Sequence, residues 1–311
     1  MKQLKVVSYL SGIPTKNNSP EKPAILRNFV QGVRSTGDVG INHQGFDLQD
    51  CDVAVLQGFV HQQSKNMPHL RLRRQVIERQ KQLGRRTLVV DSNLFLYLNK
   101  SNKPFHYLRY SFDGVFRETG FYFDQDVDPN RWKTIKQDYG IDLKDYRSKG
   151  SYILLCLQRN GGWSMKGANV LDFCEQTIQK IRQYTDRPIV VRGHPGDAKT
   201  YALLQQKYKN ILSPIHKTLQ DDLKKAWAVV VFNSSPGVAS LIEGVPVFQM
   251  DPSDKHSMYS EIANRDLSQI ENPELFDRQD WIERISMCHW KFSETQSGKA
   301  WDFMKNYVYR Q

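Results

Sequence analysis

Short apolar runs alternate with segments of helical period along most of the chain, and the alternation is clearest after residue 150. The apolar runs there predict buried strands at 152–157, 189–191, 229–232 and 245–250, with a further short strand at 210–212. The helical spacing predicts helices at 168–184, 201–207, 219–226 and 236–243. This order of elements favours a parallel sheet with helices on both faces.

The first half of the chain follows the same alternation less regularly. It predicts strands at 4–9, 38–42, 50–59 and 87–90, with helices at 24–33 and 70–83. The segment 101–149 is rich in aromatic residues and has no clear period, so we expect loops and short helices there, ending in a linker at 145–150. Its aromatic side chains indicate a packed satellite core, and a surface for stacking bases or sugars is the alternative.

These patterns predict an α/β protein of two Rossmann-like, doubly wound domains that face a cleft. We expect an N-terminal domain at 1–149 and a C-terminal domain at 150–311. Two amphipathic helices are predicted at 281–290 and 299–309, and they are able to pack back on the first domain.

The stretch 226–251 combines a buried strand, a polar turn, a helix and a second buried strand. Asn233, Ser234 and Ser235 form the turn, and Pro236 is placed where the first turn of a helix begins. Free backbone N–H groups, the helix dipole and two hydroxyls therefore converge at one point where an anion can bind. The alternative is that one serine only caps the helix.

Two other loops follow predicted strands of the same sheet, and ligands of such sheets bind beyond the carboxyl ends of the strands. His194, in the sequence Arg192-Gly193-His194-Pro195, can donate to a phosphate oxygen, and Arg192 can add a second contact. The loop at 158–162 brings the charge of Arg159 together with Asn160 and Gly161. This loop matches neither a Walker A motif nor a G-x-G-x-x-G fingerprint.

The His194-Pro195 pair, followed by Ser234-Ser235, a helix, a glycine and a V-P-V strand, resembles the C-terminal domain of GT-B glycosyltransferases. The sequence is most similar to capsule Kdo-transferase-like families and to bacterial sialyl- and polysialyltransferases, over residues 152–251. This resemblance implies that His194, Ser234 and Ser235, with Asn233 adjacent, contact the phosphate of a nucleotide-sugar donor. The capsule-type pattern carries a glutamate where this chain has Ala239. Glu243, one turn further along the helix, is the candidate for that role, with a solvated helix-end carboxylate as the alternative.

The resemblance also implies a base in the first domain that takes the proton from an acceptor hydroxyl, with no metal required. Asp91 ends a predicted buried strand, and Asp113 stands in a Ser-Phe-Asp-Gly sequence that resembles the aspartate-glycine motif of sialyltransferases. We favour Asp91 over Asp113. The D-x-D sequence at 50–52 precedes its strand and is not expected to bind a metal.

The net charge of +11 suits a nucleic acid, an anionic membrane surface or a phosphorylated substrate, and a basic protein without a polyanionic ligand is the alternative. The predicted helix at 70–83 and the residues just beyond it concentrate positive charge in Arg71, Arg73, Arg74, Arg79, Lys81, Arg85 and Arg86. A solvated helix face is the ordinary explanation. A DNA-binding face is the functional one, with a flipped base received by the aromatic segment. We therefore expect a glycosyltransferase acting on hydroxymethylated pyrimidines in DNA. A cell-envelope, capsular or lipopolysaccharide glycosyltransferase is the alternative, and a non-catalytic nucleotide- or nucleic-acid-binding protein is a second one.

Composition adds few further limits. The sequence contains no apolar run of about 20 residues and no signal-peptide layout, so a cytoplasmic protein is expected. Four cysteines are scattered without metal-ligand spacing, which indicates reduced thiols, most of them in the core. We expect no cofactor apart from the nucleotide-sugar co-substrate.

Overall fold

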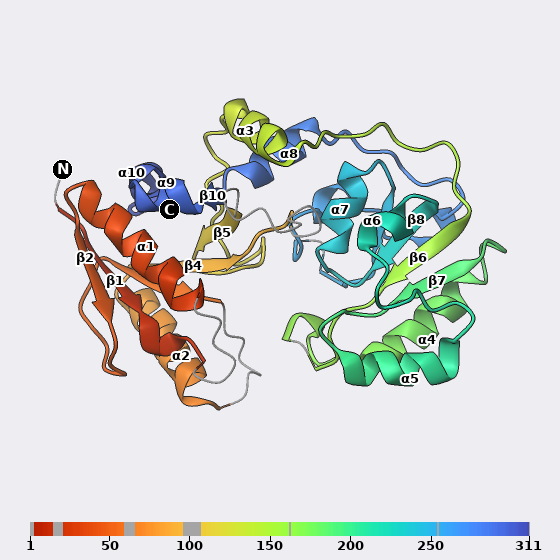
Figure 1. Cartoon of the computed structure of the whole chain (residues 1–311), viewed down its shortest axis with the longest axis horizontal. Helices are drawn as coiled ribbons and strands as arrows, with labels where there is room; N and C mark the ends of the chain where they lie inside the picture. The colour runs from red at the N-terminus through yellow and green to blue at the C-terminus, as the bar shows by residue number, and fades with distance from the viewer. Residues whose placement is uncertain are drawn as a thin grey trace. The chain divides into compact units, whose positions relative to one another are not determined.

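The computed structural model describes residues 3–14, 21–58, 66–95, 107–161, 163–253 and 255–310. The chain divides into two units. One consists of residues Met1–Tyr139 and Ile282–Gln311, and the other of residues Gly140–Trp281. Each unit is built around one sheet (Figure 1).

The first unit contains a six-stranded sheet in the order β10-β5-β4-β3-β1-β2. Its strands are β1 (Lys5–Tyr9), β2 (Val39–His43), β3 (Val53–Gln57), β4 (Arg86–Ser92), β5 (Tyr107–Phe112) and β10 (His289–Lys291). Strands β1 to β4 are parallel, as predicted, whereas β5 runs antiparallel to β4 and to β10. The expectation of a wholly parallel sheet is therefore wrong at this edge.

Helices cover both faces of the first sheet. They are α1 (Glu21–Ser35), α2 (Pro68–Gln82), α3 (Pro129–Tyr139), α9 (Phe292–Gln296) and α10 (Lys299–Met304), with 3-10 turns η1 (Leu10–Gly12) and η7 (Lys305–Tyr307). The crossovers through α1 and α2 lead in opposite directions along the sheet, so right-handed connections place these two helices on opposite faces. Leu72 and Val76 of α2 pack on Val7 and Leu56 of the strands. Helices α9 and α10 pack on α1.

The second unit contains a four-stranded parallel sheet in the order β7-β6-β8-β9. Its strands are β6 (Tyr152–Cys156), β7 (Ile189–Arg192), β8 (Ala226–Val231) and β9 (Val247–Gln249). Its helices are α4 (Val170–Ile181), α5 (Ala198–Tyr208), α6 (Leu219–Leu223) and α7 (Pro236–Ile242), with 3-10 turns η4 (Trp163–Met165), η5 (Ser260–Ile262) and η6 (Leu267–Gln269). Helix α8 (Gln279–Ser286) includes the division between the units.

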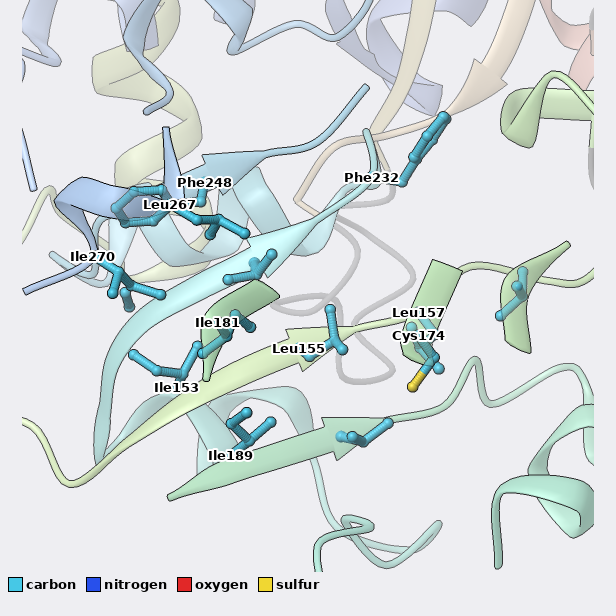
Figure 2. Packing of buried hydrophobic residues seen from close by; sticks show 14 of the residues in the cluster. Ile153, Leu155, Leu157, Cys174, Ile181, Ile189, Phe232, Phe248, Leu267 and Ile270 are labelled. Carbon is cyan, nitrogen blue, oxygen red and sulfur yellow. The ribbon is translucent and has the colours of Figure 1, made fainter. Parts of the chain in front are cut away.

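The core of the second unit confirms the predicted buried strands. Figure 2 shows Ile153 and Leu155 of β6 among the apolar side chains of this cluster, which also includes Ile181 of α4 and the later residues Leu267 and Ile270. All five of these residues are buried. The sheet of the second unit is therefore held mainly by apolar packing, which leaves the loops that follow its strands able to carry polar residues.

Two predictions along the chain need correction. The segment 101–149 contains the fully buried strand β5 and the helix α3, where only loops and short helices were expected. The predicted helix at 281–290 ends at Ser286, and His289 already belongs to β10. The aromatic side chains between Tyr107 and Phe123 are largely buried and pack on one another and on Tyr307, which confirms the satellite core for the described part of that segment.

All four cysteines, Cys51, Cys156, Cys174 and Cys288, are buried free thiols, which confirms the expectation from their spacing. Among the described helices, none has the length and apolar character needed to cross a bilayer.

Candidate functional site

Three loops lie at the carboxyl edge of the second sheet, where the strands β6, β7 and β8 end. Arg159 follows β6, His194 follows β7, and Ser234 and Ser235 follow β8, so each occupies the strand-end position predicted for it. The crossovers from β6 and from β8 lead in opposite directions along the sheet, which makes the gap between these two strands a topological switch point. Ligands of open α/β sheets bind at such points.

The loops after β6 and β8 are joined by two side-chain amides. Gln158 Nε2 donates to Asn233 Oδ1 at 2.9 Å, and the Asn233 backbone N–H donates back to Gln158 Oε1 at 3.3 Å. Asn233 Nδ2 donates to Asp251 Oδ2 at 2.6 Å and to the Ser164 carbonyl at 2.9 Å. Because the Asn233 side chain is fully used in these bonds, its role is to position the serine loop.

Asp251 lies behind Asn233 with its carboxylate completely buried. It accepts a hydrogen bond from the Ser253 backbone N–H at 2.9 Å, and Lys166 Nζ lies 3.6 Å from its Oδ1. His256 Nε2 lies 3.9 Å from Oδ2. Gln158 and Asp251 stand at strand ends without a recognisable motif around them, so neither could be predicted as a site residue from the sequence.

The loops after β6 and β7 are also joined. Arg159 Nη2 donates to the Gly196 carbonyl at 3.1 Å, and the Asn160 backbone N–H donates to Asp197 Oδ2 at 2.9 Å. Burial acts to raise the pKa of Asp197, but hydrogen bonds from Asn160 and Thr200 more than offset it, so this pKa lies below its usual value. The Asn160 side chain accepts from the Gly161 and Val170 backbone N–H groups and therefore shapes the loop itself.

His194 is held in one tautomer. Its Nδ1 accepts a hydrogen bond from the Gly196 backbone N–H at 3.0 Å, which leaves the proton of the neutral ring on Nε2. Burial, and then the nearby positive charge of Arg159, lower the pKa of His194 below 6.5. At neutral pH the ring is therefore an uncharged donor through Nε2–H.

The two serine hydroxyls are not used to cap α7. Ser235 occupies the N-cap position with helical backbone angles and makes no side-chain cap hydrogen bond. The Ser234 hydroxyl is buried and has no hydrogen-bond partner among the described residues. Since burying an unpaired hydroxyl costs about 1–3 kcal/mol, this atom is expected to serve a ligand. The capping alternative is thereby excluded.

The close packing of Gly237 sets the position of this serine loop. A Cβ atom at Gly237 would lie only 2.3 Å from the Tyr259 ring, so α7 begins in direct contact with Tyr259. The Tyr259 hydroxyl donates to the Ser234 carbonyl at 2.7 Å. The backbone of Ser234 is therefore fixed while its hydroxyl stays without a partner.

Two predicted donor contacts are directed elsewhere. Arg192 Nη1 donates to the completely buried Asp222 Oδ2 at 2.7 Å and to the Lys217 carbonyl at 2.9 Å, so its guanidinium is held at Asp222, which also pairs with Lys217 Nζ at 2.8 Å. Glu243 lies at the C-terminal end of α7, about 12 Å from Ser235 at the ordinary helical rise. Its carboxylate pairs with Lys144 at 2.5 Å. Neither side chain joins the strand-end loops.

In the first unit the two candidate bases lie at opposite ends of β4. Asp91 is near the carboxyl end of the strand and pairs with Arg109 at 2.6 Å. Asp113 has φ +65, accepts from the Thr87 backbone N–H at 2.9 Å and pairs with Arg86 at 2.5 Å, at the amino end. Four residues of strand separate these ends by about 13 Å. Only Asp91 lies at the edge where ligands of such sheets bind.

The seven cations of the predicted basic surface do not form a single face. Arg73 is buried, Arg85 pairs with Asp50 at 2.6 Å, and Arg86 pairs with Asp113. Arg74 is half-buried, and the exposed cations of the set are Arg71, Arg79 and Lys81. Fewer of these cations are free on the surface than the sequence indicates, because Arg73 is buried and Arg85 and Arg86 pair with carboxylates.

Two solved structures share this fold over nearly the whole chain. Thermosulfurimonas dismutans KpsC, β-Kdo 2,4 transferase, matches with a TM-score of 0.57 and 12% identity, covering 93% of this chain and 91% of that chain. The β-Kdo 2,7 transferase of KpsC from the same organism matches with a TM-score of 0.53 and 14% identity, covering 91% and 89%. No family model and no curated protein matches the sequence. At these identities the likeness confirms the α/β fold of two Rossmann-like GT-B domains, in agreement with the resemblance found in the sequence.

Proposed function

We propose that the protein is a GT-B glycosyltransferase that moves a sugar from a nucleotide-sugar donor to a hydroxyl of a cell-envelope or capsular saccharide. The likeness to the two KpsC transferases favours this substrate class over hydroxymethylated DNA, which none of the comparisons supports. The dispersal of the basic residues around α2 also weakens the DNA interpretation, because DNA affinity depends on many phosphate contacts from one face.

In this proposal the loops at the carboxyl edge of the second sheet hold the donor phosphates. His194 donates through Nε2–H from the loop after β7, the hydroxyls of Ser234 and Ser235 donate from the loop after β8, and Arg159 supplies positive charge from the loop between them. Such preorganised donors stabilise the negative charge that develops on the leaving phosphate. The amide pair of Gln158 and Asn233 holds two of these loops in register.

The observation that carries the proposal is the Ser234 hydroxyl, which is buried, has no partner among the described residues and lies at the same sheet edge as a neutral histidine donor. These two donors stand in the loops after β8 and β7, on either side of the β6 loop with Arg159, and together they suit a phosphate group better than an apolar ligand.

Asp91 is the proposed base. Its carboxylate lies at the carboxyl edge of the first sheet and is held in place by Arg109. In this role Asp91 accepts the proton of the acceptor hydroxyl as the new glycosidic bond forms. We also propose that positive charge and N–H donors replace a metal ion, so turnover should continue in the presence of EDTA.

A thermal-shift screen with UDP-, GDP-, ADP- and CMP-sugars tests the donor site. One nucleotide class should raise the melting temperature, because a ligand of the native state stabilises it by mass action. The shift should disappear in His194→Ala and persist in Asp91→Asn, which should lose turnover. No shift with any class would remove the proposal, and a shift without turnover would indicate a nucleotide-binding protein that is not an enzyme.

A further inference from the structure

A second candidate site lies in the first unit, around the buried side chain of Arg73. This residue is only 8% exposed, and among the described residues no carboxylate lies within ion-pair distance of it. The sequence ranges 15–20, 59–65 and 96–106, which the structure does not describe, contain no aspartate or glutamate. Burial lowers the pKa of Arg73 to about 10, so the guanidinium is still charged at neutral pH. Buried charges are ordinarily paired, and among the residues that the structure describes this one has no carboxylate within pairing distance.

Arg73 reaches the switch point of the first sheet. The crossovers from β1 and β3 lead in opposite directions, so the switch point lies between these two strands. Arg73 Nε donates to the carbonyl of Gly12, just after β1, at 2.6 Å. Gly58 follows β3 with φ +75, and a Cβ atom there would lie 3.0 Å from Arg73 Nη1. The guanidinium is thus anchored between the two loops where sheets of this kind bind ligands.

Unpaired amide oxygens lie at the same edge. Gln57, the last residue of β3, has a buried Oε1 without a hydrogen-bond partner among the described residues, and so does Asn93 at Oδ1, just beyond β4. Asn93 is 1% exposed, and its Nδ2 donates to the Tyr107 carbonyl at 2.6 Å. Hydroxyl groups of a ligand are suited to supply the donors that these oxygens lack among the described residues.

The charges at this edge are not balanced. Asp91 exerts an electrostatic pull on Arg73 but is itself paired with Arg109 at 2.6 Å. Two arginines therefore stand beside one aspartate, which leaves one positive charge in excess. A ligand that combines a single compact anion with hydroxyl groups matches both the excess positive charge and the unpaired amide oxygens at this edge.

We propose that Arg73, with Gln57 and Asn93, forms a binding site for the carboxylate or phosphate group of a hydroxylated acceptor. A guanidinium binds either oxyanion through two parallel N–H donors, which fixes the orientation of the ligand as well as its position. That the ligand is the acceptor rests on the proposed function; the anion site itself rests on the buried charge and its neighbours.

The test is a titration of the wild-type protein with glucuronate, glucose 6-phosphate and glucose, followed through the Arg73 Nε–Hε resonance. Glucuronate differs from glucose by its carboxylate, so glucose is the matched neutral control. We expect one or both anions to shift the resonance and glucose to leave it unchanged. A response to glucuronate alone identifies a carboxylate ligand, and a response to glucose 6-phosphate alone identifies a phosphate. If neither anion shifts the resonance, or if glucose shifts it equally, the proposal is wrong.

Substitutions make the test independent of the resonance. Arg73→Met should weaken anion binding at least tenfold, and Arg73→Lys should give an intermediate loss because it keeps the charge but not the planar fork. Arg27→Met, which removes an exposed arginine of α1, should change the affinity less than twofold. Unchanged binding in Arg73→Met would overturn the site. Thermal shifts with nucleotide-sugars should persist in Arg73→Met, so failure of the donor site and failure of the anion site can be told apart.

Discussion

Replacing Ser234 by alanine should stabilise the free protein while weakening its complex with the donor. The hydroxyl is buried and has no partner among the described residues, so its removal relieves a desolvation cost that is about 1–3 kcal/mol for such groups. We expect the free energy of unfolding of the second unit to rise by about 1 kcal/mol. In the complex the same hydroxyl donates to a charged phosphate, a bond worth about 1.5–3 kcal/mol. Its loss corresponds to a Kd about 10- to 100-fold higher.

Ser240, in the helix α7 that follows Ser234, supplies a matched control. It is completely buried, but its hydroxyl donates to the Val245 carbonyl at 3.1 Å. Ser240→Ala leaves that carbonyl unpaired, so it should lower the free energy of unfolding by about 1 kcal/mol and leave the donor affinity unchanged. Urea unfolding measures the first quantity, and calorimetric titration with the nucleotide-sugar found by the thermal-shift screen measures the second.

The two serines are therefore expected to move stability in opposite directions. If Ser234→Ala destabilised the protein as much as Ser240→Ala does, the hydroxyl would have a structural partner. An unchanged Kd in Ser234→Ala would separately refute its contact with the donor.

Three other predictions concern the packing around both sheets. Lowering the pH from 7.5 to 5 should reduce the free energy of unfolding by about 2 kcal/mol through His289 alone, because burial holds its pKa at about 3 in the folded chain against 6.5 when unfolded, so the unfolded chain binds more protons in this range. Urea unfolding of the wild type and of His289→Gln at both pH values gives this contribution as a difference, and equal losses in the two proteins would contradict it. Glu294→Gln removes the charge that pairs with the buried Arg131 at 2.7 Å, and it should lower the free energy of unfolding by about 3 kcal/mol in the same assay. A decrease of less than about 1 kcal/mol would show that the pair contributes little to stability. Gly237→Ala should both lower stability by about 1–3 kcal/mol and weaken donor binding, since the added Cβ meets Tyr259; calorimetric titration would contradict this if the affinity stayed at the wild-type value.

The second unit was predicted well because its strands are apolar on both faces. Runs such as Val229 to Val231 leave no choice of period, and the polar residues that follow them stand at the strand ends. In the first unit β5 was missed because it contains Arg109 and Ser111, which are buried. Their cost is offset by Asp91 and by the Gly114 carbonyl, and neither partner can be inferred from the strand's own sequence.

The candidate sites show the same limit. Motifs in the sequence identified His194 and the two serines, but the network of Gln158 and Asp251 behind them depends on contacts between distant loops. Arg73 has the sequence context of a solvent-exposed helix residue, and only the fold turns its side chain toward Gly12. Residues at a site that depend on tertiary contacts of this kind cannot be read from spacing alone.

The return of residues 282–311 to the first unit imposes an order on folding during synthesis. Strand β10 completes the sheet edge beside β5, and helices α9 and α10 pack on α1, so the first unit stays unfinished until the final segment has emerged from the ribosome. The second unit occupies one uninterrupted stretch and can close earlier, even though it is synthesised later than most of the first. The surface of α1 and β5 that β10, α9 and α10 cover is therefore exposed until residues 282–311 have been synthesised, and we expect the nascent chain to be most vulnerable to aggregation there.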